Sequence, residues 1–364
     1  KSIVMIQTYS TTIRRKEMDA VLTCMVDEKI GPGELNTRLI QQVKEFFKCD
    51  SAVALRSPAI ALKYALSAMN LEKGSVVMIS ALAPFWQYQS LIDLGFVPEV
   101  LDVDDNNGLV PIEEVQKGIE NGGKVLLLHE TEGILPDFDQ LLELNIPIIE
   151  DISMSAGSSV ALSEDYLLAS KGSNDKSIVE NRKKVGSYGV YTILGLEERD
   201  VITAGGGAVL ISPNRKEWLL LKPLVDNAPL TDLLPDINSA LAWVQLKEFP
   251  RNEKIRKELF SLFQRACMIG KHKTLVRELD DGSTMSCFPL VLATPFKDVK
   301  QYTSKKEIEI QLAFENSVVA HVEDVSEKCT KAKSLYLRCV HIPLYPRLTQ
   351  SESAKIVKVL SSLP

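Results

Sequence analysis

The sequence has no apolar run that reaches the ~20 residues of a membrane-spanning helix. It also has no basic excess and no basic run, because 42 Lys and Arg residues face 48 Asp and Glu residues and the net charge is -6. These two absences argue against a membrane and against a nucleic acid as partners. Residues 1–7 show neither the apolar core nor the cleavage site of a secretory signal, so we expect a cytoplasmic location.

Cysteine and histidine are scarce and scattered. Six cysteines and four histidines are spread over 364 residues, and no two cysteines form a CxxC pair. A zinc cluster and a disulfide framework are therefore not expected. The cysteines are interpreted as buried or idle thiols in a reducing cytoplasm, and no metal site is predicted.

The pattern that does occur is an alternation of short apolar runs and amphipathic stretches. The apolar runs are rich in Val, Ile and Leu, which is typical of strands covered on both faces. The alternation predicts an α/β fold with a mostly parallel sheet and right-handed crossovers. The expected strands are 51–55, 75–80, 97–101, 124–128 and 146–149, and the expected helices between them are 59–69, 85–94, 111–120 and 138–144.

The second half of the chain departs from this rhythm. A polar excursion is expected at about 163–186, followed by strands at 190–194 and 208–212. A long helix from Asp236 to Cys267 is expected to bend at Pro250. A strand at 287–292 and helices near 304–314 and 351–363 complete the chain. We therefore expect a large domain over residues 1–230, and a long helix with a small α+β domain over residues 231–364.

Asp151 is the first candidate functional residue, because ligands of open parallel sheets bind at the carboxyl ends of strands. A carboxylate there can hold a cationic ring nitrogen, as in pyridoxal phosphate (PLP) enzymes, or can cap a helix. The Gly205-Gly206-Gly207 run fits either a phosphate contact or a tight turn. His129 also follows a strand, but without a Ser or Cys partner it forms no triad.

Eight segments occur in an order that resembles one family, the DegT/StrS-type nucleotide-sugar aminotransferases. The resemblance covers essentially the whole chain and implies the aspartate aminotransferase fold (PLP fold type I), a homodimer and nucleotide-sugar chemistry of the kind used in polysaccharide biosynthesis. The segments are 31–34 (GPGE), 71–77 (LEKGSVV), 95–104 (GFVPEVLDVD), 129–137 (HETEGILPD), 150–157 (EDISMSAG), 200–208 (DVITAGGGA), 236–246 (DINSALAWVQL) and 341–349 (HIPLYPRLT).

The resemblance also implies a cofactor site that this chain has altered. Asp200 stands where the family carries the lysine that forms the Schiff base with PLP, and an aspartate cannot form an imine. Gly195 stands where a serine binds the cofactor phosphate. In the phosphate loop that begins at Ser57, Pro58 has no N–H and Ala59 has no hydroxyl.

The remaining site positions complete the comparison. Met154 replaces the glutamine that contacts the ring, and the partner chain's asparagine and arginine correspond loosely to Thr231 and Leu233. Asp151 is retained, and the aromatic residue that stacks on the ring corresponds to Phe85 or Trp86. Asp151 without a ring nitrogen is expected to bond to local hydroxyls or amides.

These losses predict a catalytically degenerate homologue. No cofactor is expected, because each lost charge-assisted phosphate contact removes ~1.5–3 kcal/mol. Such a protein would bind a nucleotide-sugar-like ligand, or an active paralogue as its partner. The alternative is an active PLP- or PMP-dependent aminotransferase or dehydratase with a remodelled site.

Within that alternative, two routes to activity remain open. Asp200 would be the general base, since some relatives have histidine at the lysine position and dehydrate sugars. Otherwise a lysine of the excursion (Lys171, Lys176, Lys183 or Lys184) would replace the missing amine.

Overall fold

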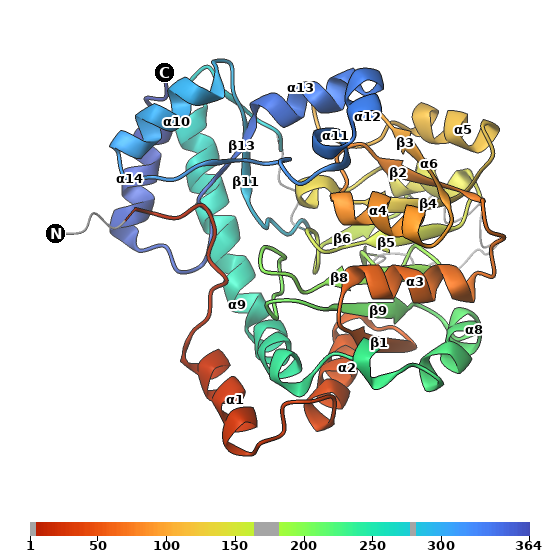
Figure 1. The fold of residues 1–364 in the computed structure, drawn as a ribbon. Coiled ribbons are helices and arrows are strands. Elements are labelled where there is room, and N and C mark those ends of the chain that lie inside the picture. The colour runs from red at the N-terminus through yellow and green to blue at the C-terminus, as the bar shows by residue number, and fades with distance from the viewer. Residues whose placement is uncertain (1–4, 164–181, 277–281) are drawn as a thin grey trace.

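The computed structural model describes residues 5–163, 182–276 and 282–364. Its main element is a seven-stranded sheet of order β1-β9-β8-β5-β4-β2-β3, in which β9 alone runs antiparallel to its neighbours (Figure 1). This confirms the predicted α/β class with a mostly parallel sheet. The strands are β1 (Ser51–Leu55), β2 (Val76–Ser80), β3 (Val97–Leu101), β4 (Gly123–His129), β5 (Ile148–Asp151), β8 (Tyr191–Gly195) and β9 (Ala208–Ser212).

Helices cover both faces of this sheet. Successive strand residues point to opposite faces, so Val77 and Ile79 of β2 join one apolar cluster while Met78 joins the other. Each face is therefore buried from solvent, which explains the near-continuous apolar strands of the sequence. One face carries α3 (Pro58–Ala68), α4 (Phe85–Asp93) and α8 (Arg215–Asp226), and the other carries α2 (Glu34–Phe47), α5 (Ile112–Glu120) and α6 (Phe138–Glu143).

Helix α9 (Asp236–Cys267) links the large sheet to a smaller one (Figure 1). Its first part packs Ala242 and Leu246 against the large sheet, and its last part packs Phe260 and Phe263 into a separate apolar cluster. Pro250 lies inside the helix and does not end it.

The smaller sheet is antiparallel, with the order β10-β11-β13-β12. It is built from β10 (Lys273–Thr274), β11 (Phe288–Val291), β12 (Gln311–Leu312) and β13 (Cys339–Ile342), with α10 (Phe296–Lys305) and α14 (Gln350–Leu360) packed beside it.

Packing crosses the expected domain boundary at residue 230 in both directions. Ile6 pairs with Ile308 and belongs to the apolar cluster of the smaller sheet. Conversely, α11 (Val318–His321), α12 (Glu323–Lys328) and α13 (Thr330–Arg338) pack onto the large sheet's cluster. The division into residues 1–230 and 231–364 stays a prediction.

The helix predicted at 304–314 is wrong. The helix in this region is α10 (Phe296–Lys305), which ends where Glu307 adopts a positive φ of 57°. After it Ile308 and Ile310 are buried while Glu309 and Gln311 are less so, which is the period-two alternation of a strand.

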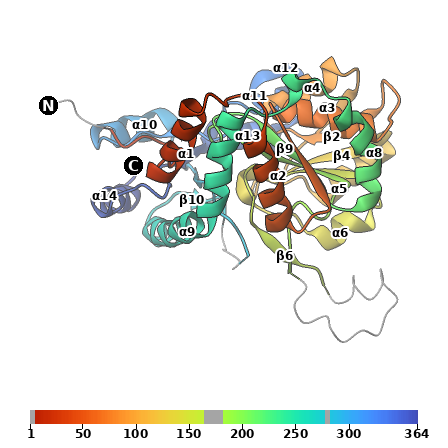
Figure 2. The same ribbon diagram turned by 90° about the horizontal axis from the view of Figure 1, so that it is seen from below.

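The polar excursion lies largely outside the described residues, since 164–181 are not described. The segments on either side of these residues pair as antiparallel strands β6 (Ser159–Ala161) and β7 (Arg182–Lys184), on the lower side of the large sheet in Figure 2. Within the described part of the chain, none of the helices combines the length and apolar character of a membrane span.

Helix α1 (Arg15–Val26) is amphipathic and turns its apolar side outward. Met18, Leu22 and Met25 are each more than half exposed, whereas Glu17 and Cys24 are buried where α1 packs along α9. A helix that exposes its apolar stripe has an unsatisfied hydrophobic face in the single chain.

Candidate functional site

The candidate site lies where β4, β5 and β8 end. His129 is the register partner of Asp151, and Asp151 is in turn the partner of Ile193, so the ends of the three strands are adjacent. A cavity of about 340 Å³ opens beside them, and we call it the strand-end cavity. This is the edge at which ligands bind to open parallel sheets.

Asp151 is buried and accepts hydrogen bonds from Ser153 and from Gln87. Its Oδ1 accepts hydrogen bonds from the Ser153 amide (3.1 Å) and the Ser153 hydroxyl, and its Oδ2 accepts one from Gln87 Nε2 at 2.7 Å. His129 Nδ1 lies 3.5 Å from Oδ2. Burial alone would raise the pKa of Asp151, but His129 and Ser153 hold it below its usual value. Asp151 is therefore a carboxylate at neutral pH.

Gln87 was missed by the sequence analysis. Its side chain is completely buried in α4, and its Oε1 has no hydrogen-bond partner within the described structure. The one available signal was a glutamine inside the otherwise apolar Phe85-Trp86-Gln87-Tyr88 stretch, where burial would demand a partner.

Asp200 and Gly195 form a matched pair. Asp200 lines the strand-end cavity and accepts a hydrogen bond from the Glu197 amide at 2.7 Å. A Cβ atom built on Gly195 would lie 2.4 Å from Asp200 Oδ2 and 2.5 Å from Ser153 Oγ. The carboxylate can approach the strand only because residue 195 has no side chain. Burial, aided by the charges of Asp151 and Glu197, raises the pKa of Asp200 to about 8.

The residues of the expected phosphate loop form the start of helix α3. Ser57 caps α3 by accepting a hydrogen bond from the Ile60 amide at 3.2 Å, and Pro58 occupies the first helical position. Ser57, Pro58 and Ala59 are not among the residues that line the strand-end cavity.

The two candidate aromatic residues lie in different places. Trp86 lines the strand-end cavity, as does Met154. Phe85 faces elsewhere and lies 4.9 Å from the His321 ring, centroid to centroid.

The segment that includes Thr231 and Leu233 lies against its own chain. Leu233 pairs with Leu55 of β1, and Asp232 bonds to Lys63 (3.0 Å) and Tyr64 (2.8 Å) of α3. Thr231 is exposed. The single chain gives no role to Thr231 or Leu233 in the strand-end cavity.

The lysines that were candidates to replace the missing amine divide into two groups. Lys171 and Lys176 lie outside the described residues. Lys183 is exposed on β7, and Lys184 donates a hydrogen bond to the Phe46 carbonyl at 2.8 Å. No lysine lines the strand-end cavity within the described part of the chain.

The charge around the cavity is mostly negative. Among the described lining residues, three glutamates (Glu132, Glu197 and Glu198) outnumber the one arginine, Arg199, while Asp200 keeps its proton at neutral pH because its pKa is raised to about 8. Arg199 stacks over the Tyr9 ring at 4.3 Å and pairs with Glu315 at 3.3 Å. Such a lining repels an added dianion unless carboxyl groups are protonated.

The residues present fit one part of a PLP-type cofactor and not the others. Asp151 and His129 at the strand ends, with Trp86 beside them, suit a pyridine ring. For the imine, the described residues supply no lysine at the cavity. The cofactor phosphate would meet Ser57, which already caps its own helix, Pro58, which has no N–H, and Gly195, which has no hydroxyl.

Comparison with known proteins shows what the whole chain resembles. The model of a family described as the DegT/DnrJ/EryC1/StrS aminotransferase family matches residues 11–221 and 231–361. A curated relative, the GDP-perosamine synthase of Vibrio cholerae, is 21% identical over 213 residues, which are 57% of this chain and 53% of the relative. The chain thus matches only about half of that relative's length.

Solved structures share the fold over nearly the full length. A Streptococcus pneumoniae protein described as a sugar aminotransferase, Spr1654, in its PLP form has a TM-score of 0.82 at 15% identity, covering 96% of each chain. The Escherichia coli GDP-4-keto-6-deoxy-D-mannose-3-dehydratase with bound hydrated PLP also has a TM-score of 0.82 at 15% identity, covering 98% of this chain and 100% of the other. At this identity the likeness establishes the fold.

The prediction that no cofactor is expected is wrong. The similar solved structures are described with PLP or PMP in this fold. The missing lysine and phosphate contacts do not by themselves exclude a cofactor, because Asp151, His129 and Trp86 lie together beside a cavity.

Proposed function

This chain belongs to the DegT/DnrJ/EryC1/StrS aminotransferase family, and we propose that it binds a nucleotide-sugar-like ligand without lysine-dependent transamination. The membership confirms the resemblance found in the sequence. One observation carries the proposal: a carboxyl group, Asp200, stands at the amine position, and the adjoining Gly195 fits that carboxyl group. An acid cannot condense with an aldehyde, so the covalent step of transamination has no nucleophile there.

A GDP-linked sugar is the ligand class that we propose. The curated relative is named for GDP-perosamine, and a dehydratase of this fold is described with bound GDP-perosamine. A second cavity of about 400 Å³ shares Tyr9 and Glu198 with the strand-end cavity. Arg347 lines it and is a basic side chain that suits a diphosphate.

PLP or PMP would be held by contacts alone in this proposal. When bound, such a cofactor supplies an electron-accepting ring. Asp151 would hold the ring nitrogen, and Trp86 would cover the ring. The hydrated PLP described in the dehydratase structure is a form whose aldehyde carbon carries water in place of an amine, which supports non-covalent retention.

The first test is chemical trapping. The purified protein is mixed with PLP, reduced with borohydride and analysed by peptide mass spectrometry. We expect no lysine adduct in the wild type and an adduct at residue 200 in the Asp200→Lys variant, which serves as the positive control. A stoichiometric adduct on any lysine of the wild-type protein would overturn the proposal.

The second test concerns the ligand. Calorimetric titration with GDP-perosamine is expected to show saturable binding, and UDP-glucose is the matched control for a nucleotide sugar with another base. Equal binding of both, or of neither, contradicts the GDP-sugar assignment.

A second candidate function, PLP- or PMP-dependent sugar dehydration, is favoured by a different observation. The pKa of Asp200, raised to about 8, suits a group that accepts and returns protons near neutral pH. The test is glutamate-dependent turnover of GDP-4-keto-6-deoxymannose by PLP-loaded wild-type protein. Turnover that is lost in Asp200→Asn would replace the binding function with this one.

We further propose that the chain works as a homodimer in the cytoplasm, or beside an active paralogue. The exposed apolar side of α1 supports a partner chain. The six free cysteines support a reducing compartment.

A further inference from the structure

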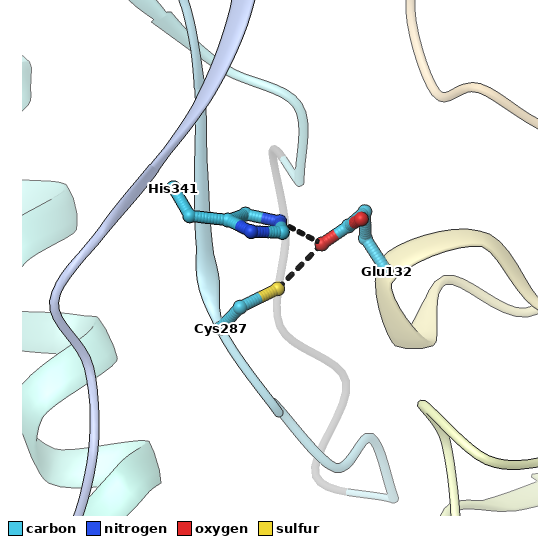
Figure 3. Close-up of side chains that lie close together, drawn as sticks. All are labelled: Glu132, Cys287 and His341. Atoms are coloured by element: carbon cyan, nitrogen blue, oxygen red, sulfur yellow. Dashed lines mark hydrogen bonds and ion pairs between the residues drawn. The ribbon is translucent and has the colours of Figure 1, made fainter. Parts of the chain in front are cut away.

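Three side chains of different chemistry meet at the edge of the strand-end cavity. Glu132 lies in the short turn η1 (Thr131–Gly133) after β4, Cys287 precedes β11, and His341 lies on β13. They come from the large sheet on one side and the smaller sheet on the other, and their functional atoms point toward one another (Figure 3). We call them the Glu132–Cys287–His341 cluster.

The cluster is tight and almost completely shielded from solvent. Cys287 Sγ and His341 Nε2 each lie 2.6 Å from the same oxygen, Glu132 Oε2. All three ligand atoms lie within 4.8 Å of one another, and the three residues are 4–5% exposed. Buried acidic, thiol and imidazole groups cost free energy unless they share protons or a cation.

The donor set matches Zn²⁺ more closely than other common divalent cations. Zinc takes thiolate, imidazole and carboxylate ligands at about 2.0–2.3 Å in a tetrahedron, whereas Mg²⁺ and Ca²⁺ select oxygen donors. Three protein ligands leave the fourth position open. Glu132 and His341 both line the strand-end cavity, so that position would face its interior.

Two further features bear on the geometry of the cluster. The Tyr9 hydroxyl is hydrogen-bonded to His341 Nδ1, which directs Nε2 toward Glu132, and metal-bound histidines likewise have their other ring nitrogen held by a hydrogen bond. Glu132 adopts a left-handed φ of 56°, which is a strained backbone for a residue with a side chain and is common at functional sites.

We propose that Glu132, Cys287 and His341 form a Zn²⁺ site that opens into the strand-end cavity. Metal binding displaces the protons that the three groups otherwise share, and the thiol and imidazole nitrogen become ligands. The site does not depend on the proposed sugar function, because none of the three residues is assigned to it.

Cobalt substitution gives the sharpest test. The chelator-treated protein is titrated with Co²⁺ and then with Zn²⁺. We expect one Co²⁺ per chain, with the visible bands of tetrahedral Co²⁺ and a thiolate charge-transfer band, and Zn²⁺ should abolish both sets of bands. Absence of saturable Co²⁺ and Zn²⁺ binding would overturn the proposal and leave a proton-sharing network.

Variants separate this site from adventitious binding. Cys287→Ser should lose the charge-transfer band, and His341→Ala should weaken Zn²⁺ binding at least ~100-fold. Cys339→Ser is the matched control, because Cys339 is equally buried and lies two residues from His341. Tyr9→Phe should keep the stoichiometry and weaken binding about 10-fold.

If Cys339→Ser loses as much Zn²⁺ affinity as Cys287→Ser, or the charge-transfer band survives in Cys287→Ser, the assignment is wrong. Circular dichroism of each variant shows that a loss is not unfolding.

Discussion

At the scale of single residues, two substitutions in the candidate site depend on each other. A Cβ atom built on Gly195 would lie 2.4 Å from Asp200 Oδ2, so the carboxyl group occupies space that a side chain at residue 195 would need. A change at one position therefore alters what the other position tolerates.

This dependence predicts a coupling that can be measured. We expect Gly195→Ala to lower the free energy of unfolding by about 1–3 kcal/mol, because the added methyl overpacks the site. In an Asp200→Ala background the cost should be smaller, although contact with Ser153 persists. Urea denaturation of the four proteins of the cycle gives the coupling. Gly31→Ala, where nothing lies within 4 Å, is the control and should be nearly neutral. Strict additivity would contradict the pairing.

The raised pKa of Asp200 predicts how stability varies with pH. The folded protein holds this proton up to about pH 8, whereas the unfolded chain releases it near pH ~4, so this group makes stability fall as pH rises through that window. Asp200→Asn removes the effect and keeps an acceptor for the Glu197 amide.

Thermal or urea denaturation should therefore show Asp200→Asn gaining about 1–2 kcal/mol over wild type between pH 5 and pH 8, a value reduced for solvent access through the cavity. Asp50→Asn changes an exposed aspartate and is the control. A difference between Asp200→Asn and wild type that is constant across this pH range would show that Asp200 is ionised throughout.

At the scale of elements, one carboxylate joins the first turns of two helices that are far apart in the sequence. Asp236, at the start of α9, accepts hydrogen bonds from the amides of Gly33 (2.9 Å), Leu35 (3.1 Å) and Asn36 (2.8 Å) at the start of α2. The segments 31–34 and 236–246 are about 200 residues apart in the sequence and meet in space. Asp236 closes the amino end of α2 as a capping residue of that helix would.

Removing this cap should be costly. We expect Asp236→Ala to lower the free energy of unfolding by about 2–4 kcal/mol, because several amides lose their acceptor where Asp236 is buried. Asp298→Ala is the matched control, since Asp298 also lies in the first turn of a helix (α10) but is exposed. Equal effects of the two substitutions in denaturant titrations would contradict the shared cap.

The strands around the site were predictable and several of its contacts were not. Apolar runs predicted β1 and β9 to the residue, and the bounds of β3 were also predicted although that strand contains Pro98 and Glu99. Asp151 followed from its place at a strand end. Phe85 and Trp86 could not be separated, because one residue turns a helix by about 100° and the register was uncertain. The contact of Glu132 with Cys287 joins positions 155 residues apart, and spacing rules detect metal ligands only when they are close in sequence.

At the scale of the whole molecule, the apolar side of α1 predicts a second copy of the chain. Met18, Leu22, Met25 and Ile30 are 54–57% exposed and Val26 is 72% exposed, a contiguous patch that a single chain leaves in water. We expect sedimentation velocity at micromolar concentration to give twice the chain mass of 40.4 kDa. The double variant Leu22→Glu and Met25→Glu should sediment as a monomer, because two charges cannot be buried unpaired in an apolar interface. Leu337→Glu changes an equally exposed leucine of α13 and should remain dimeric. A monomeric wild type, or dimers in all three proteins, would place the partner surface elsewhere.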